Sequence, residues 1–274
     1  MRSRVESLKE LSQICQKPKY KEIGNWMVRH ILRDAALPVT WLLLHTSITA
    51  NQVTLISLVV GLIGIACFAF VSKVGFLIGT LLLQTWYFLD HVDGQIARYR
   101  KTASLSGRFF DFITHHIIHG TVFFSLGLYL YFIGGGIYFV VWGFITSIAI
   151  AVFNLINDTK YKTFFEKLVG IKEIRIQSKA ESAGAKPTKD IHAIPRTIFS
   201  LIHKLSEIHV LMNILTLAAF LEFIFRLPFD LRILLFIFYG LAVPLLTTVK
   251  LIYLITQKKI DTEFETIFQN MERP

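Results

Sequence analysis

The chain has 274 residues, of which 53% are hydrophobic and 18% are charged, and its mean hydropathy is +0.54. These values exclude an ordinary soluble enzyme and indicate an integral membrane protein. The formal net charge of +10 would suggest nucleic-acid binding in a soluble chain. Here it indicates loops that face anionic lipid, and we expect no nucleic-acid partner.

Residues 1–48 are predicted to form a cytoplasmic, interfacial amphipathic segment. Its first thirty residues are rich in Lys and Arg and contain no apolar core of signal-peptide length. The apolar run at 35–45 is too short to span a bilayer and contains Pro38, which favours an interfacial or re-entrant helix. The two cysteines, Cys15 and Cys67, lie in unlike surroundings, so no disulfide framework is indicated.

Six apolar runs follow, and each is close to the roughly 20 residues that a helix needs to cross a bilayer. They cover residues 52–72, 74–92, 109–133, 137–156, 208–227 and 231–256. We therefore predict an all-α fold, an integral membrane bundle of six transmembrane helices over residues 49–256. An N-terminal amphipathic juxtamembrane helix precedes the bundle, and a cytoplasmic tail, 257–274, follows it.

The basic residues predict the orientation of this bundle. Only three of the 29 Lys and Arg residues, namely Lys73, Arg226 and Arg232, fall outside one alternate set of connecting segments. Because Lys and Arg concentrate on the cytoplasmic side, both termini and the polar loop at 157–206 are predicted to be cytoplasmic. The segment that joins the second and third runs is predicted to face the same side.

That joining segment lies within the stretch DHVDGQIARYRKTASLSGRFFDFITHHIIH, residues 90–119. If the second helix continues to about Arg98, then Asp90 and Asp93 lie on nearly one face. Gly94 and Ala97 lie on that face as well, and their small side chains let a helix or a ligand approach the backbone.

The third helix carries a matching stripe, in which Gly107, Asp111, His115 and His119 recur at four-residue spacing. Antiparallel packing of the two helices would therefore bring their acids and His115 together near the cytoplasmic membrane surface. Asp111 lies in an apolar, aromatic context, and an acid inside a membrane segment is a functional candidate. His115 alone would more often be an internally hydrogen-bonded helix histidine, but its spacing from Asp111 favours a functional role.

Carboxylates that converge at low dielectric need a positive partner, and a divalent cation is the natural one. Oxygen ligands favour Mg²⁺ or Mn²⁺, and an imidazole shifts the preference toward Mn²⁺ or another transition metal. Mg²⁺ usually shares its coordination with substrate phosphates, which the neighbouring Arg98 and Arg108 would also suit. Arg100 and Lys101 have an equally good interpretation as the basic cytoplasmic flank of a helix.

Seven of these positions resemble the signature of the CDP-alcohol phosphotransferases, which are integral membrane enzymes of phospholipid synthesis. The signature is Asp, two residues, Asp-Gly, two residues, Ala-Arg, eight residues, Gly, three residues, Asp, three residues, Asp. The matching residues are Asp90, Asp93, Gly94, Ala97, Arg98, Gly107 and Asp111. Residues 48–57 are also similar to the start of the family's first spanning helix, with Ala50 in place of proline. The final aspartate of the signature is replaced by His115.

The resemblance implies the following roles. Asp90, Asp93 and Asp111 would hold one or two Mg²⁺ or Mn²⁺ ions, and His115 would be a further ligand and the general base. Gly107 would be a helix-packing position. The residues that would line the nucleotide site are Gly94, Ala97, Arg98, Ser104, Asn51 and Thr54. Homodimerisation is a further expectation that follows from the resemblance alone.

We expect transfer of a phosphatidyl group from CDP-diacylglycerol to a small polar alcohol, with release of CMP. One alternative is transfer of a CDP-linked head group to a lipid alcohol such as diacylglycerol. A cation transporter and a non-catalytic member of the family remain as further alternatives. A phosphorylated acceptor would be favoured if basic residues line the acceptor pocket, and the candidates are Arg33, Arg108, Lys160 and Lys162.

Overall fold

The computed structural model describes residues 5–16, 22, 26–170, 204–205, 207–225 and 227–268. All regular elements in these ranges are helices, and no strand occurs in them. The predicted all-α fold is therefore confirmed for the described part of the chain.

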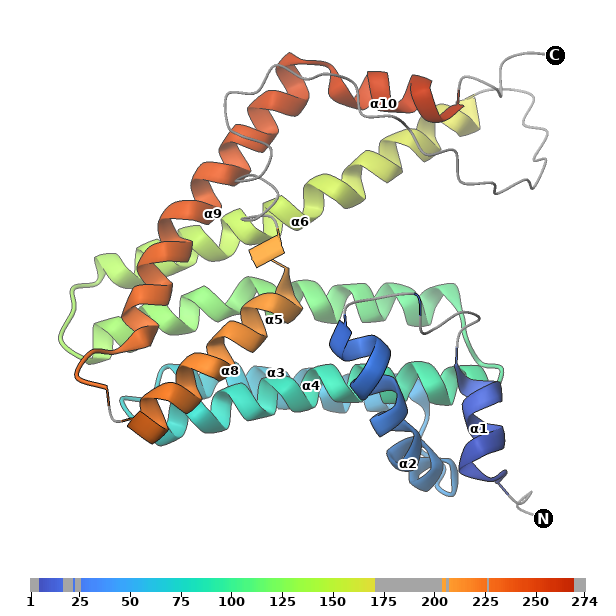
Figure 1. Ribbon diagram of the computed structural model, residues 1–274. Coiled ribbons are helices and arrows are strands. Elements are labelled where there is room, and N and C mark those ends of the chain that lie inside the picture. Colours follow the sequence, from blue (N-terminus) through green and yellow to red (C-terminus); the bar gives the residue numbers. More distant parts are fainter. Residues whose placement is uncertain are drawn as a thin grey trace.

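Six long helices make up the body of the protein (Figure 1). They are α3 (Ala50–Phe68), α4 (Lys73–Tyr99), α5 (Leu105–Phe132), α6 (Tyr138–Gly170), α8 (Ile208–Phe225) and α9 (Leu231–Thr256). Four of them, α3, α6, α8 and α9, are long and apolar enough to cross a membrane. Helices α4 and α5 are longer than 25 residues, but the polar residues of the 90–119 stretch lower their hydropathy. The count of six spans therefore stays a prediction.

Consecutive helices run in opposite directions. The turns after α3, α5 and α8 therefore lie at one end of the bundle, and the turn after α4 lies at the other end (Figure 1). Helix α3 packs against α4 and α5, α5 packs against α6, and α8 and α9 cover α4 and α6 respectively. The shared core contains large side chains that are almost fully buried, among them Trp86, Phe123, Phe236 and Tyr239. Helix α3 therefore packs against both α4 and α5, the two helices that carry the polar stretch.

A pair of glycines sets the distance between α3 and α4. A Cβ atom on Gly64 would lie 2.8 Å from the Gly79 carbonyl oxygen, and one on Gly79 would lie 2.6 Å from the Gly64 carbonyl oxygen. Each helix therefore touches the other's backbone at a point where no side chain fits. Close backbone contact through small residues is a common way to join helices in membranes, where burial in lipid gives little driving force.

The N-terminal segment is docked onto the end of α4 (Figure 1). It contains α1 (Leu8–Cys15), a short π-helical segment η1 (Val28–Leu32), and α2 (Arg33–Leu44). Ser7 and Glu10 form a capping box that starts α1. Leu11 and Leu37 from this segment share a buried cluster with Val92 and Ile96 of α4. The amphipathic segment is thus also one wall of the region around the polar stretch.

Helix α6 extends beyond the expected end of the fourth run, so the loop predicted from residue 157 does not begin there. Helix α6 runs to Gly170, and its last turns pack against α10 (Lys259–Phe268), which lies inside the expected tail. Phe164 contacts Phe264 with ring centroids 5.4 Å apart, and Lys160 pairs with Glu263 at 2.8 Å. The rest of the predicted loop, apart from residues 204 and 205, lies outside the described residues.

Candidate active site

The turn between α4 and α5 brings the two halves of the polar stretch together. Lys101 adopts a left-handed backbone conformation (φ 54°), which reverses the chain after α4. Ser104 then caps α5, because its hydroxyl accepts a hydrogen bond from the Gly107 amide at 3.0 Å. Arg100 donates to the carbonyl oxygens of Ile48 and Thr46 at 2.5 and 2.8 Å. Arg100 therefore ties this turn to the start of α3.

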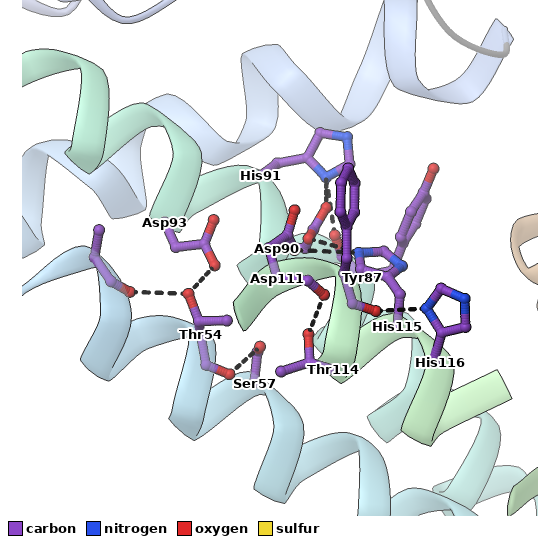
Figure 2. Close-up of polar contacts among 12 residues, drawn as sticks. Thr54, Ser57, Tyr87, Asp90, His91, Asp93, Asp111, Thr114, His115 and His116 are labelled. Carbon is purple, nitrogen blue, oxygen red and sulfur yellow. Dashed lines mark hydrogen bonds and ion pairs between the residues drawn. The ribbon is translucent and has the colours of Figure 1, made fainter. Parts of the chain in front are cut away.

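Three of the four residues that were expected to converge do so (Figure 2). His115 Nε2 donates a hydrogen bond to Asp90 Oδ1 at 2.9 Å and lies 3.4 Å from Asp111 Oδ1. One ligand atom from each of these residues lies within 4.8 Å of the other two. The His115 ring also packs edge-on against the buried Trp86, with centroids 4.9 Å apart. These contacts hold the imidazole between the two carboxylates.

Asp93 lies beside this cluster but is held by α3. Its side chain is only 8% exposed, and its Oδ2 accepts a hydrogen bond from the Thr54 hydroxyl at 2.5 Å. Figure 2 shows the carboxylate turned toward Thr54 and away from the other acids. Of the four side chains predicted as metal ligands, Asp90, Asp111 and His115 lie together, and Asp93 occupies a neighbouring position.

The histidines that follow in the sequence face α6. His116 Nε2 lies 3.2 Å from the carboxylate of Asp158, and its Nδ1 donates to the Phe112 carbonyl oxygen. The buried His119 bonds with Asn154 through its Nδ1 at 2.7 Å. His119 thus departs from the stripe expected on α5, and His115 is the histidine that meets the acids.

The chemistry of the three clustered side chains suits a divalent cation. Asp111 Oδ1 is buried and accepts no hydrogen bond from the described part of the chain. A buried carboxylate oxygen without a donor is costly unless a cation or a proton reaches it. Two carboxylates and one imidazole are donors that Mn²⁺ and related ions accept, and Mg²⁺ accepts the oxygens. The residues present therefore fit the metal that the sequence predicts.

A cavity of 630 Å³ lies beside the acids, and we call it the first cavity. Asp93, Asp111 and Arg98 line it, and Arg108 adds a second cation to the lining. All the residues expected at the nucleotide site line it, and so does Gly107: Asn51, Thr54, Gly94, Ala97, Arg98, Ser104 and Gly107.

The two glycines of the signature keep the first cavity open. A Cβ atom on Gly94 would meet only the Arg98 side chain, at 3.2 Å. A Cβ atom on Gly107 would meet Ser104 Oγ at 3.3 Å and Asn51 Oδ1 at 3.5 Å. Both neighbours of Gly107 are side chains that line the cavity, and no helix backbone approaches it. These distances favour a role in shaping the cavity over the expected packing role.

The acids also line a second cavity, of 440 Å³. Asp90 and His115 line it, together with Arg33 from α2, His91 from α4 and His209 from α8. The residues shared by both cavities are Asp93, Gly94, Arg98 and Asp111. The two cavities therefore meet at these four residues.

Residues 47–224, more than half of the chain, match the family model described as CDP-alcohol phosphatidyltransferase. The chain belongs to this family. No curated protein matches the sequence, so the comparisons give no narrower assignment. Members of the CDP-alcohol phosphatidyltransferase family are transferases that depend on divalent metal, with a CDP-alcohol donor and a lipid or alcohol acceptor. The predicted family and the transferase activity at this general level are confirmed.

Most of the residues that line the second cavity were not predicted from the sequence. Arg33 was one of four basic candidates, and the structure separates them. Arg33 and Arg108 line cavities, whereas Lys160 pairs with Glu263 and Lys162 is an exposed residue near Glu166. His91 could have been predicted as a cavity residue, because it directly follows Asp90 in the sequence. Nothing in the sequence marks His209, because α8 is far from the motif along the chain.

The N-terminal helix α1 also contributes to the site. Arg98 Nε donates a hydrogen bond to the Cys15 carbonyl oxygen at the end of α1. Such a carbonyl has no partner within its own helix, and a cation there also interacts favourably with the helix dipole. Next to it, Tyr99 donates to Glu6 at 2.5 Å, and this hydrogen bond raises the pKa of Tyr99 to about 12. Helix α1 thus fixes Arg98 where the two cavities meet.

Proposed function

We propose that this protein transfers the phosphatidyl group of CDP-diacylglycerol to a small polar alcohol and releases CMP. The observation that carries the proposal is the meeting of Asp90, Asp111 and His115 at the boundary between two cavities. The first cavity suits the CDP moiety, because it combines the small residues of the signature with Arg98 and Arg108. The second cavity is then the chamber for the acceptor.

In the proposed reaction, the acceptor hydroxyl oxygen attacks the phosphorus that carries diacylglycerol. A new bond forms between that oxygen and phosphorus, and the bond from phosphorus to the bridging diphosphate oxygen breaks. The bridging oxygen leaves with CMP, and the hydroxyl proton leaves the acceptor. The two reactants would enter from different cavities that share Asp93, Gly94, Arg98 and Asp111, which brings them together at the acids.

We propose His115 as the group that takes the acceptor proton. An imidazole takes a proton readily near neutral pH. Because Nε2 donates to Asp90, the ring nitrogen left to accept a proton is Nδ1. His115 lines the second cavity, which is the side from which the acceptor would come. Asp90 orients the ring, as a carboxylate does for a catalytic histidine in many enzymes.

Asp90 and Asp111 would hold the divalent ion, either Mg²⁺ or Mn²⁺. While His115 acts as the base, its Nε2 carries a proton and its Nδ1 accepts one, so the ring has no lone pair left for the ion. When bound, the ion would neutralise charge on the diphosphate and on the departing phosphate oxygen. Asp93 stays fixed by Thr54 at the edge of both cavities. It adds negative charge near the ion and is the position from which a second ion would be held.

We further propose six membrane spans with both termini in the cytoplasm. The distribution of Lys and Arg supports this orientation, and so does the position of α1 and α10 toward the same end of the bundle (Figure 1). The polar cluster lies at that end, close to the turn between α4 and α5. A site at the membrane surface lets one reactant come from the lipid and the other from the cytoplasm.

The test measures CMP release by the purified full-length protein in mixed micelles with MnCl₂ or MgCl₂. CDP-diacylglycerol with a series of polar alcohols is compared with CDP-linked alcohols and diacylglycerol. We expect release from CDP-diacylglycerol and its loss in Asp111→Asn. The matched control is Asp158→Asn, which removes an exposed acid on α6 and should leave the rate unchanged. Release only from a CDP-linked alcohol would reverse the assignment of donor and acceptor. Cation flux in liposomes without CMP release would replace the enzyme with a transporter.

A further inference from the structure

A second group of polar side chains lies at the end of the bundle opposite to the candidate active site, where the turns after α3, α5 and α8 are found (Figure 1). It consists of Tyr129 from α5, Glu222 from α8, Asp230, which caps α9, and Arg232 from α9. We call these four residues the far cluster. None of them lines either cavity, so the far cluster has no part in the proposed reaction.

Within the far cluster, Asp230 and Arg232 form a complete ion pair. Arg232 Nε and Nη2 donate to Asp230 at 3.1 and 2.9 Å, and Nη1 donates to the Phe70 carbonyl oxygen at 3.1 Å. The guanidinium carbon also lies 3.6 Å from the centre of the Tyr129 ring, whose hydroxyl donates to Asp230. The guanidinium group is only slightly exposed, and its charge is balanced by Asp230.

Glu222 is the acid that this pair leaves over. Its side chain is 0% exposed. Oε1 accepts a hydrogen bond from the Leu231 amide, whereas Oε2 is buried and accepts none from the residues that the structure describes. Lys73, which α4 contributes at the same end, donates instead to the Leu227 carbonyl oxygen at 3.2 Å. An ionised Glu222 would therefore be a buried charge whose second oxygen has no donor, and such a charge is costly inside a membrane protein.

The carboxyl groups of Glu222 and Asp230 are neighbours. Leu231, whose amide binds Glu222, directly follows Asp230 in the chain, and the two side chains interact with each other. Two carboxylates at close range repel, but a proton on one of them turns the repulsion into a hydrogen bond. Hydrogen bonds from Arg232 and Tyr129 already stabilise the ionised form of Asp230. The proton therefore belongs on Glu222.

We infer that Glu222 is a proton-binding site, in which the Oε2–H group donates to the Asp230 carboxylate and locks the end of α8 to the start of α9. The ligand is a proton taken from the water on that side of the membrane. Asp230 extends the lock to α5 through Tyr129, and Arg232 extends it to the end of α3 through the Phe70 carbonyl oxygen. Loss of the proton places a second negative charge beside Asp230 and weakens this joint. The inference is independent of the proposed function.

The bound proton makes the stability of the protein depend on pH. An unfolded chain releases the proton of a glutamic acid above about pH 4.3, whereas the folded protein keeps the one on Glu222. The folded state then holds one proton more than the unfolded state, so its stability falls as the pH rises, until folded Glu222 is ionised as well. Each pH unit changes the unfolding equilibrium about tenfold, which lowers the midpoint of thermal unfolding by about 3–5 °C in a chain of roughly this size.

The first test compares Glu222→Gln with the wild type by thermal unfolding of the purified full-length protein in detergent, between pH 5 and pH 8. The glutamine amide keeps a donor for Asp230 and an acceptor for the Leu231 amide at every pH. We expect similar midpoints at pH 5, and at pH 8 a midpoint about 3–5 °C or more above that of the wild type. Glu166→Gln makes the same substitution at an exposed position on α6 and should follow the wild-type profile. A constant difference between Glu222→Gln and the wild type over this range would overturn the inference.

Infrared spectroscopy detects the proton directly, because a protonated carboxyl group has a carbonyl stretch distinct from that of a carboxylate. At pH 6 we expect a band of this kind in the wild type and in Glu166→Gln, and its loss in Glu222→Gln. If the spectra of the wild type and of folded Glu222→Gln show the same carboxyl bands, Glu222 is ionised and the inference is refuted.

A second variant and a cation titration complete the test. If Glu222→Gln does not fold, Asp230→Asn removes the neighbouring charge and keeps a residue that caps α9 well. An ionised Glu222 could then pair with Arg232, so stability should fall less with rising pH than in the wild type; an unchanged profile would contradict the shared proton. Stabilisation of the wild type by Na⁺ or Ca²⁺ at pH 6, lost in either variant, would replace the proton with a metal ion and overturn the inference.

Discussion

Replacement of His115 tests the residue in which this chain departs from its family signature. In His115→Ala, the contacts to Asp90 at 2.9 Å and to Asp111 at 3.4 Å are lost together with the edge contact to Trp86. A positioned general base contributes about 10²–10⁴ to the rate, so we expect a loss of activity of that size. The lost hydrogen bond to a carboxylate and the ring contact are worth about 2–4 kcal/mol together.

His115→Asp restores the carboxylate of the signature. Because Asp can accept a proton and can hold a metal through oxygen, we expect partial activity and a shift in preference from Mn²⁺ toward Mg²⁺. CMP release is measured across a concentration series of both ions, and thermal unfolding of each variant shows that it is folded. The control is His116→Ala, which removes the neighbouring imidazole that faces Asp158.

Activity of His115→Ala equal to that of the wild type would refute the base role. A rate that falls equally in His115→Ala and His116→Ala would also contradict the reasoning, since only one of these rings contacts the acids. If His115→Asp lost all activity while it stayed folded, the imidazole itself would be required, and the restored carboxylate would not be its chemical equivalent.

Three further predictions concern the surroundings of the site. Thr54→Val removes the hydrogen bond to Asp93 and should lower CMP release about tenfold with little change in thermal stability, whereas Thr54→Ser should restore it. Gly79→Leu forces α3 away from α4 and should lower the midpoint of thermal unfolding by several degrees; an unchanged midpoint would contradict the close contact at Gly64. Burial raises the pKa of the Cys15 thiol to about 11, so at pH 8 about one thousandth is thiolate. Iodoacetamide should therefore label Cys15 slowly in the folded protein, with the rate rising up to pH 11, and quickly after denaturation.

The meeting of polar side chains from α4 and α5 was predictable, because it follows from four-residue spacing and a short turn. Asp90, Asp111 and His115 are all placed by that local pattern. The separate position of Asp93 was not predictable, since it depends on where Thr54 of α3 lies beside α4. That depends in turn on a contact between backbones at Gly64 and Gly79, which sequence periodicity does not reveal.

The end of α6 was harder to predict, because it also depends on contacts between segments far apart in the sequence. Lys160 and Lys162 suggested a loop after the fourth apolar run, yet α6 continues through them to Gly170. The continuation is supported by contacts with α10, which comes much later in the chain. Arg33 was one of four basic candidates, but its place at the second cavity was not predictable, because it depends on a π-helical change of register and on amides of Gln16 and Gln95.

The hydrogen bond from Arg98 to the Cys15 carbonyl has a practical consequence. It links an arginine that lines both cavities to a helix that exposes Leu8 and Ile14, two apolar side chains suited to the surface of a bilayer. Detergent, membrane curvature or a bulky fusion partner that pulls α1 off the bundle would release the guanidinium as well. The position of an affinity tag should therefore affect the activity of this chain. A tag at the C-terminal end is the safer choice for the first enzyme assays.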